Sequence, residues 1–384
     1  MTMFDPTEIN QSGFVSVSDA ERLALLNGQL RYAAARSAYY AETLAGLAPL
    51  TDLDALAALP FTDAGTLRRE GRRLVCVPAG EIARIVSLST SGSTGAAKRL
   101  YFTENDLART VRFFSEGMSW LCARGDVCAI LMPCAAPDGI GDLLCRALRA
   151  IGVCPLPVGL PEDLAVVRET LLRERPQVLV GFPWHLRLLA LLCPTLRPRA
   201  VLLSGDYVPA GVGPLLEAQW KTTVTTHFGM TETGYGCAVQ HPCGGVMHLR
   251  RDELIAEVVS PETGAPLPAG STGELVLTTL RREALPLLRY RTGDRAVLSP
   301  AGDLVRVDGR LDVPREFYSL QDALSPLPWL WDYRVRDGRL SALLTPSAPG
   351  DAAALLEKCS GLPAACRTVP ADEISLFDRG KRSF

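Results

Sequence analysis

The chain has 384 residues, of which 47% are hydrophobic and 21% are charged, and its formal net charge at pH 7 is −2. A chain of this length can form two or three domains, and the near-neutral charge gives no electrostatic basis for binding nucleic acid or an anionic membrane surface. No uncharged apolar run is long enough to span a bilayer, and the N-terminus lacks a basic and then apolar leader, so we expect a cytoplasmic protein.

The first part of the chain predicts helices and then two strands around a polar loop. Residues 18–48 carry apolar side chains at helical spacing and predict two helices. Thr62 or Asp63 is expected to cap a further short helix. Residues 84–88 and 99–103 predict strands.

The loop between these strands, residues 89–98, reads Ser-Thr-Ser-Gly-Ser-Thr-Gly-Ala-Ala-Lys. Glycines let the backbone approach a ligand closely, successive amides in such a turn bind anions, and Lys98 adds a full positive charge. A polyphosphate would fit this loop. The pattern is not a Walker A loop, because the lysine comes three residues after the second glycine and a strand follows. The alternative is an ordinary solvated turn.

The middle of the chain alternates apolar strands with helices. Thr103 and Asp106 predict a capping box for a helix over 103–121. Strands are expected at 127–132, 152–157, 178–181, 200–203 and 222–228, and helices at 139–151, 163–174, 183–192 and 214–219. This alternation predicts an α/β fold with a mostly parallel sheet covered by helices.

The last part changes character. Short alternating strands over residues 254–297 predict a small antiparallel subdomain. A smaller unit follows, with a hairpin over 335–344 and a helix over 351–358. We therefore expect a large N-terminal domain, residues 1–310, and a short, mobile α+β C-terminal domain, residues 311–384.

The stretch after the strand at 222–228 reads His-Phe-Gly-Met-Thr-Glu-Thr-Gly. Open α/β sheets bind ligands at the carboxyl ends of their strands. Phe228 could stack on a purine, Thr231 could donate to a phosphate, and Glu232 could hold Mg²⁺. The alternative is a strand-end turn with a helix-start glutamate.

Three more positions have side chains suited to a nucleotide. Asp294 follows a glycine turn and could accept both hydroxyls of a ribose, the alternative being a solvated turn. Arg310 could reach a phosphate, and Asp312 could be a hinge residue. Lys381 follows a glycine near the chain end, a position at which a lone lysine is normally solvated.

In this order and at these separations, the five stretches resemble the adenylate-forming superfamily of acyl-CoA synthetases, luciferases and peptide-synthetase adenylation domains. Residues 59–63, 264–280 and 283–294 look most like the phenylacetate–CoA ligase branch, and the likeness extends from about residue 60 to 312. It implies activation of an aromatic or otherwise flat carboxylic acid by ATP to an acyl-adenylate, with release of pyrophosphate and transfer to a thiol such as coenzyme A. That branch is commonly dimeric, which implies a homodimer.

The resemblance also assigns roles to individual residues. The catalytic residues would be Lys98, Thr231, Glu232 (the Mg²⁺ ligand) and Lys381, which bridges the carboxylate and the α-phosphate. ATP would be held by Thr90, Ser91, Gly92, Ser93, Thr94, Gly95, Ser204, Gly205, Asp206, Tyr207, Phe228, Gly229, Met230, Asp294 and Arg310. The acid would lie against Met132, Pro133, Gly139, Gly141, Trp184 and His185, and the C-terminal domain would rotate about Asp312 between the two half-reactions.

The tail departs from the family pattern. After Asp312 the chain reads Val-Pro-Arg-Glu-Phe, where the family usually has a glycine-containing hairpin that helps to admit the pantetheine arm, and Pro314 interrupts the strand pattern. One alternative is therefore transfer of the acyl group to an amine, a reductase or a carrier protein. A further alternative is a non-catalytic nucleotide-binding protein of the same fold.

Cysteines and histidines raise two further questions. Eleven cysteines lack framework spacing, and Cys128, Cys145, Cys154 and Cys193 lie in apolar runs, so we expect buried free thiols in a reducing compartment. The spacing Cys-x3-His-x-Cys-x4-His offers four ligands for a structural Zn²⁺, with buried thiols and surface imidazoles as the alternative. The four ligands would be Cys237, His241, Cys243 and His248, of which the last two are also implied by the resemblance.

Overall fold

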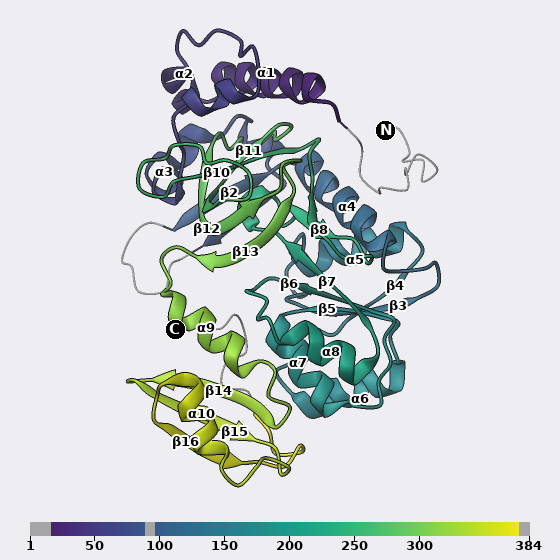
Figure 1. Cartoon of the computed structure of the whole chain (residues 1–384). Coiled ribbons are helices and arrows are strands. Elements are labelled where there is room, and N and C mark those ends of the chain that lie inside the picture. Colours follow the sequence, from purple (N-terminus) through teal and green to yellow (C-terminus); the bar gives the residue numbers. More distant parts are fainter. Residues whose placement is uncertain (1–16, 89–96, 376–384) are drawn as a thin grey trace. The chain divides into compact units, whose positions relative to one another are not determined.

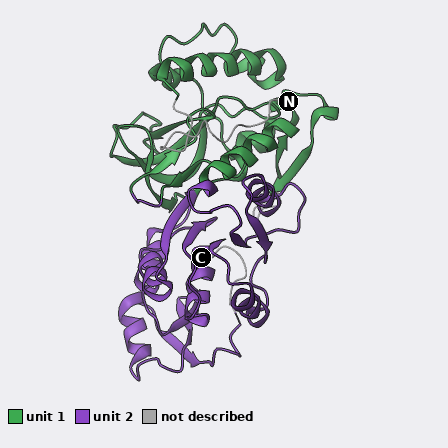
Figure 2. Ribbon diagram, turned by 90° about the vertical axis from the view of Figure 1, so that its right-hand side faces the viewer, with its two compact units in different colours: residues 1–117, 228–241, 245–311 green, residues 118–227, 242–244, 312–384 purple. Residues whose placement is uncertain are grey.

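The computed structural model describes residues 17–88 and 97–375 (Figure 1). The chain divides into two compact units (Figure 2). Unit 1 consists of residues 1–117, 228–241 and 245–311, and unit 2 of residues 118–227, 242–244 and 312–384. The domain boundary expected from the sequence, between residues 310 and 311, stays a prediction.

Unit 1 begins with helices whose N-termini are capped as the sequence predicts. Asp63 accepts a hydrogen bond from the Thr66 amide at 2.6 Å, and Thr103 and Asp106 accept each other's amide hydrogen bonds. The α-helices are α1 (Asp19–Arg36), α2 (Ala38–Thr43), α3 (Ala64–Glu70) and α4 (Glu104–Ser119), and the 3₁₀ helices are η2 (Asp54–Ala58), η3 (Gly71–Leu74), η4 (Ala79–Glu81) and η5 (Thr231–Thr233).

The strands of unit 1 are antiparallel. β1 (Arg84–Leu88) pairs with β2 (Lys98–Phe102). A second sheet runs in the order β10-β11-β12-β13-β9-β8, with β8 (Ala238–Gln240), β9 (Met247–Leu249), β10 (Leu254–Val259), β11 (Thr272–Thr279), β12 (Tyr290–Leu298) and β13 (Leu304–Arg310). The predicted antiparallel subdomain is therefore present, and it extends beyond residues 254–297 to include β8, β9 and β13.

Unit 2 is built on a parallel sheet in the order β7-β6-β5-β3-β4. Its strands β5 and β6 are buried along their whole length, which explains their uninterrupted apolar sequences. The elements are β3 (Val127–Leu131), α5 (Ile140–Ala150), β4 (Cys154–Pro157), α6 (Leu164–Glu174), β5 (Val178–Gly181), α7 (Pro183–Leu192), β6 (Ala200–Ser204), α8 (Val212–Trp220) and β7 (Thr223–Phe228). The alternating pattern predicted from the sequence is confirmed.

The rest of unit 2 is a three-stranded sheet with two helices. α9 (Arg315–Leu324) is followed by β14 (Leu330–Arg336), β15 (Arg339–Leu344), α10 (Ala352–Ser360) and β16 (Ala364–Thr368). β15 pairs antiparallel with β14 and parallel with β16. The sequence did not predict α9: Pro314 does not interrupt a strand but immediately precedes this helix, where its fixed φ and missing N–H cost nothing.

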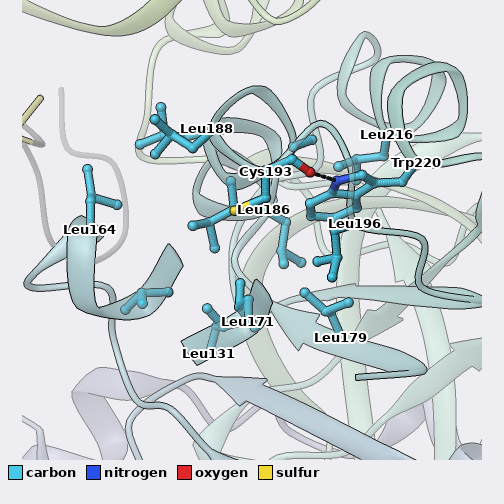
Figure 3. Packing of buried hydrophobic residues seen from close by; sticks show 14 of the residues in the cluster. Leu131, Leu164, Leu171, Leu179, Leu186, Leu188, Cys193, Leu196, Leu216 and Trp220 are labelled. Carbon is cyan, nitrogen blue, oxygen red and sulfur yellow. Dashed lines mark hydrogen bonds between the residues drawn. The ribbon is translucent and has the colours of Figure 1, made fainter. Parts of the chain in front are cut away.

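One hydrophobic core joins these parts of unit 2 (Figure 3). Leucines of α6, α7 and α8 belong to this core together with Trp220, whose indole N–H donates to the Cys193 carbonyl at 2.9 Å. Trp331, Leu343 and Val369 belong to the same cluster. Residues 312–375 are thus packed into unit 2 through buried apolar surface.

The cysteines correct one expectation. All eleven are free, and Cys128, Cys145 and Cys193 are buried as predicted, but Cys154 is exposed. Cys154 starts β4, which lies at the end of the sheet order, so its side chain is not covered. Across residues 17–88 and 97–375, no helix is both long and apolar enough to cross a membrane.

Candidate functional site

In unit 1, an ion pair lies at the end of the predicted phosphate loop. Lys98 begins β2, opposite Leu88 of β1, and its ammonium group pairs with the Glu232 carboxylate. Both side chains are largely shielded from water, with exposed fractions of 14% and 8%. Burying a lone charge is costly, and here the two opposite charges lie against each other.

Two further side chains fix Glu232. The Tyr290 hydroxyl donates to its Oε1 at 3.3 Å, and burial beside this carboxylate raises the tyrosine's pKa, so the phenol remains a donor. Arg282 donates to the Glu232 carbonyl at 3.0 Å and lies over the Phe102 ring. Backbone and side chain of Glu232 are therefore both held in place.

Asp294 and Arg310 form a second polar pair in unit 1. They lie opposite each other on β12 and β13, with Arg310 Nη1 3.4 Å from Asp294 Oδ1 and 2.9 Å from the Thr292 carbonyl. Gly293 has a φ of +75°, and a Cβ there would be 2.9 Å from Arg310 Nη2. Any other residue would be strained at this φ, and its Cβ would crowd the guanidinium.

The turn from Phe228 to Thr231 is closed by its own backbone. The Phe228 carbonyl accepts from the Cys237 amide at 3.0 Å, and the Met230 carbonyl accepts from the Tyr235 amide at 2.8 Å. Phe228 and Met230 are partly buried against the core of unit 1, whereas Gly229 and Thr231 are half-buried between them and Glu232. The side chains of Phe228 and Met230 are thus only partly covered by protein.

In unit 2, residues 204–207 leave the end of β6. Ser204 is paired in register with His227 of β7, and its Oγ lies 2.8 Å from His227 Nδ1. Gly205 has a φ of +86°, and a Cβ there would lie 2.4 Å from the Phe182 ring and 3.1 Å from Met132 Cε. This backbone position therefore requires glycine.

His227 is held neutral by its surroundings. Burial lowers its pKa from 6.5 to about 4, because an imidazolium would lose its hydration there. The residue immediately before Phe228 thus carries no charge at neutral pH, and its imidazole is fixed by the contact with Ser204.

The residues predicted to contact the acid are not alike in their surroundings. Met132 is buried just after β3. The Pro133 carbonyl accepts a hydrogen bond from the Gly141 amide at 3.2 Å. Gly139 caps α5. His185 is buried, with the Phe182 ring 5.5 Å from its own.

Trp184 has partners within unit 2 that account for its burial. Its indole N–H donates to Asp332 at 3.0 Å, and its ring packs edge-on against Tyr333. We infer that Trp184 holds α7 against β14, and its role in an acid pocket stays a prediction.

Several predicted residues cannot be placed. Thr90, Ser91, Gly92, Ser93, Thr94, Gly95 and Lys381 lie outside the described residues. Asp312 is the first residue of unit 2 after unit 1 ends at Leu311. Its role as a hinge stays a prediction.

The predicted zinc site is not assembled, and we correct that expectation. Within residues 17–88 and 97–375, no three His, Cys, Asp or Glu side chains are gathered to hold a metal ion. Cys237 lies in the core of unit 1 with its Sγ 2.9 Å from Thr233 Oγ1, and burial raises its pKa to about 12. The side chain of His248 lies beside Asp303 instead, with its Nδ1 3.6 Å from Asp303 Oδ2. His241 and Cys243 join no such group.

Tyr290 and Arg282 were missed in the sequence. Tyr290 lies between two arginines, and a strand points alternate side chains to opposite faces. Arg289 pairs with Glu257 and Arg291 with Glu274, so both arginines are already neutralised. The alternation of side chains along the strand could have indicated that Tyr290 faces the opposite way from the two arginines. Nothing in the sequence indicates that Arg282 contacts the Glu232 carbonyl.

Solved structures of CoA ligases have this fold. This chain matches a crystal structure of 2-hydroxyisobutyryl-CoA ligase in the postadenylation state, in complex with R3-HIB-AMP. The TM-score is 0.75 and the identity 19%, over 95% of this chain and 89% of that one. A crystal structure of an anthranilate CoA ligase matches with a TM-score of 0.52 and 18% identity, over 74% and 63% of the two chains. The chain therefore has the fold of adenylate-forming CoA ligases.

The family follows from the sequence match. Residues 75–279, more than half of the chain, match the family model described as AMP-binding enzyme, and the chain belongs to that family. A phenylacetate-coenzyme A ligase of Thermus thermophilus is 33% identical over 64% of this chain and 57% of that enzyme. One of Pseudomonas putida is 25% identical over 65% and 59%. The matched region thus spans less than two thirds of either relative.

Proposed function

We propose that this protein activates a carboxylic acid with ATP, forms an acyl-adenylate and pyrophosphate, and transfers the acyl group to the thiol of coenzyme A. The observation that carries the proposal is the buried pair of Lys98 and Glu232 inside the region matched to the AMP-binding enzymes. The relatives named phenylacetate-coenzyme A ligase support an aromatic acid as the substrate.

The adenylation step needs a binding site for a triphosphate and compensation for its charge. Lys98 would contact the β- and γ-phosphates together with residues 90–95, and Asp294 would accept the ribose hydroxyls beside Arg310. A carboxylate oxygen of the acid then attacks the α-phosphate in line, and pyrophosphate leaves. Lys381 would approach the same oxygens, and fixed positive charge lowers the barrier because negative charge builds up there.

Glu232 is suited to hold Mg²⁺. It supplies hard oxygen donors, its carboxylate is held by Lys98 and Tyr290, and its backbone is fixed by Arg282. A bound Mg²⁺ would neutralise phosphate charge. Lys98 would then pair with the triphosphate instead of this carboxylate.

ATP–pyrophosphate exchange with a panel of carboxylic acids tests adenylation. We expect exchange above background with at least one aromatic acid, such as phenylacetate. Background exchange with every acid of a broad panel would refute the proposal.

One observation favours a second acceptor. β13 ends at Arg310 and α9 begins at Arg315, so only residues 311–314 lie where the family usually has a glycine-containing hairpin. Transfer of the acyl group to an amine, a reductase or a carrier protein is therefore the second candidate. Analysis of the products formed in the presence of coenzyme A distinguishes the two candidates. Rapid formation of the thioester would eliminate the second candidate. Dimerisation and cytoplasmic location stay predictions.

A further inference from the structure

In unit 2, the end of α9 contacts the loop that follows β6. Asp322 Oδ1 and Oδ2 accept from the Tyr207 hydroxyl at 3.1 and 3.0 Å, and Oδ1 also accepts from the Ala210 amide at 2.8 Å. One turn later, Ser325 Oγ accepts from the Gly211 amide at 3.0 Å. A single helix end thus binds one side chain and two backbone amides of the loop.

The ring of Tyr207 is fixed as well as its hydroxyl. The centroid of its ring lies 4.7 Å from that of Tyr318, which is buried on α9 one turn before Asp322. An aromatic contact at this distance adds to the hydrogen bond. Tyr207 is therefore held in one orientation by two contacts with α9, the hydrogen bond to Asp322 and the ring contact with Tyr318.

α9 is itself anchored within unit 2. Arg187 of α7 is fully buried, and its guanidinium donates to the carbonyls of Ser325, Leu327 and Leu330, which carry the chain from α9 into β14. The same guanidinium lies 4.5 Å from the centre of the Trp184 ring. Because a buried guanidinium that donates to three carbonyls is expensive to release, the end of α9 is a rigid support.

We propose that Asp322 is a positioning residue for nucleotide binding, acting through Tyr207 and the Ala210 amide. The inference rests on the proposed function and on the expectation from the family resemblance that residues 204–207 help to hold ATP. The loop from Gly205 to Gly211 joins β6 to α8, and without the carboxylate its tyrosine can turn away from the nucleotide. Asp322 touches no reacting atom, so its loss weakens ATP binding and leaves the chemical step intact.

Three variants test this in the exchange assay and by calorimetric titration with ATP: Tyr207→Phe, Asp322→Ala and the double variant. We expect each single change to raise KM and Kd for ATP about tenfold, as for loss of a charge-assisted hydrogen bond, with little change in kcat. Tyr207→Phe and Asp322→Ala break the same bond, so the double variant should bind ATP no more weakly than Asp322→Ala.

Two further variants separate positioning from general stability. Asp322→Asn retains an oxygen for the Ala210 amide and a hydrogen-bonding group for Tyr207, and should restore most ATP affinity. Asp351→Ala removes an exposed carboxylate from the same part of the chain, before α10, where its side chain makes no capping hydrogen bond. This control should leave KM and Kd at the wild-type values.

The outcomes distinguish the inference from the function on which it rests. Wild-type affinity for ATP in Asp322→Ala, additive losses in the double variant, or a lower melting temperature without a change in Kd would overturn the inference. A wild-type protein that binds ATP but exchanges with no acid would refute the proposed function, and the titration would still decide about Asp322. Failure of the wild type to bind ATP would overturn both.

Discussion

Glu232 is the residue on which catalysis should depend most steeply. Replacing it by Gln removes the charge that faces Lys98 and the ligand proposed for Mg²⁺ while keeping the side-chain shape. We expect exchange to fall about 10²- to 10³-fold, as for other groups that stabilise charge in a transition state. The matched control is Glu217→Gln on α8, an exposed glutamate. Undiminished exchange by folded Glu232→Gln would remove Glu232 from the mechanism.

Asp294 should affect nucleotide affinity more than turnover. Asp294→Asn loses the charge that faces Arg310, and one of its two acceptors for a ribose becomes a donor. We expect KM for ATP to rise about tenfold with a smaller change in kcat. Asp308→Asn, two residues before Arg310 and paired with Arg306, serves as the control. Equal KM values for both variants would argue against ribose binding at Asp294.

At the level of single residues, chemical type was predictable and partners were not. Lys98 could be selected from the sequence because it follows a run of glycines and hydroxyl-bearing residues. Glu232 could be selected because it follows the end of a predicted strand. Their contact joins residues 134 positions apart, which no local pattern encodes. The zinc expectation failed for the same reason: Cys237 and His248 are close in sequence, but one side chain packs into the core and the other faces Asp303.

The neighbouring strands β6 and β7 carry a pH-dependent contribution to stability. Burial lowers the pKa of His227 from 6.5 to about 4. Between pH 4 and pH 6.5, the histidine is protonated more in the unfolded chain than in the folded one. The contribution of His227 to the free energy of unfolding is therefore lost as pH falls from about 6.5 to about 4. His227→Gln should flatten this dependence in denaturant titrations at several pH values.

The comparison must be made between variant and wild type, because another group acts in the opposite direction. Burial raises the pKa of Glu116 on α4 from 4.5 to about 7, so its contribution is present at low pH and is lost as pH rises through that interval. Glu116→Gln should therefore change the pH dependence in the opposite sense to His227→Gln. Identical pH profiles for both variants would contradict the assignment.

At the level of elements, the parallel sheet was the most predictable part. Strands buried on both faces have uninterrupted apolar sequences, as in β5 and β6, and helices between them must cross over. α9 is not expected from the sequence, because a proline at position 314 indicates an interrupted strand, whereas in the structure it precedes the helix. Its buried face, from Phe317 through Leu324, has helical spacing that could have indicated the helix.

For the molecule as a whole, residues 312–375 should be required for a soluble fold. Trp331, Leu343 and Val369 share a core with α7 and α8, so a chain ending at Leu311 would expose the leucines that they cover. We expect that truncated chain to aggregate in size-exclusion chromatography, and a chain ending at residue 375 to stay soluble. A monodisperse, folded 1–311 fragment would show that this part of the chain is dispensable for folding.

The crowding at Gly205 has a consequence for altering substrate preference. Met132, a predicted neighbour of the acid, has its terminal methyl close to the same backbone position that Phe182 covers. A larger or branched side chain at position 132, introduced to accommodate a different acid, would clash with the backbone at Gly205. Phe182 already packs against that backbone and leaves no room for it to shift. Redesign of selectivity from that side should therefore impair ATP affinity as well, and pairing it with a smaller side chain at 182 offers a way to relieve the pressure.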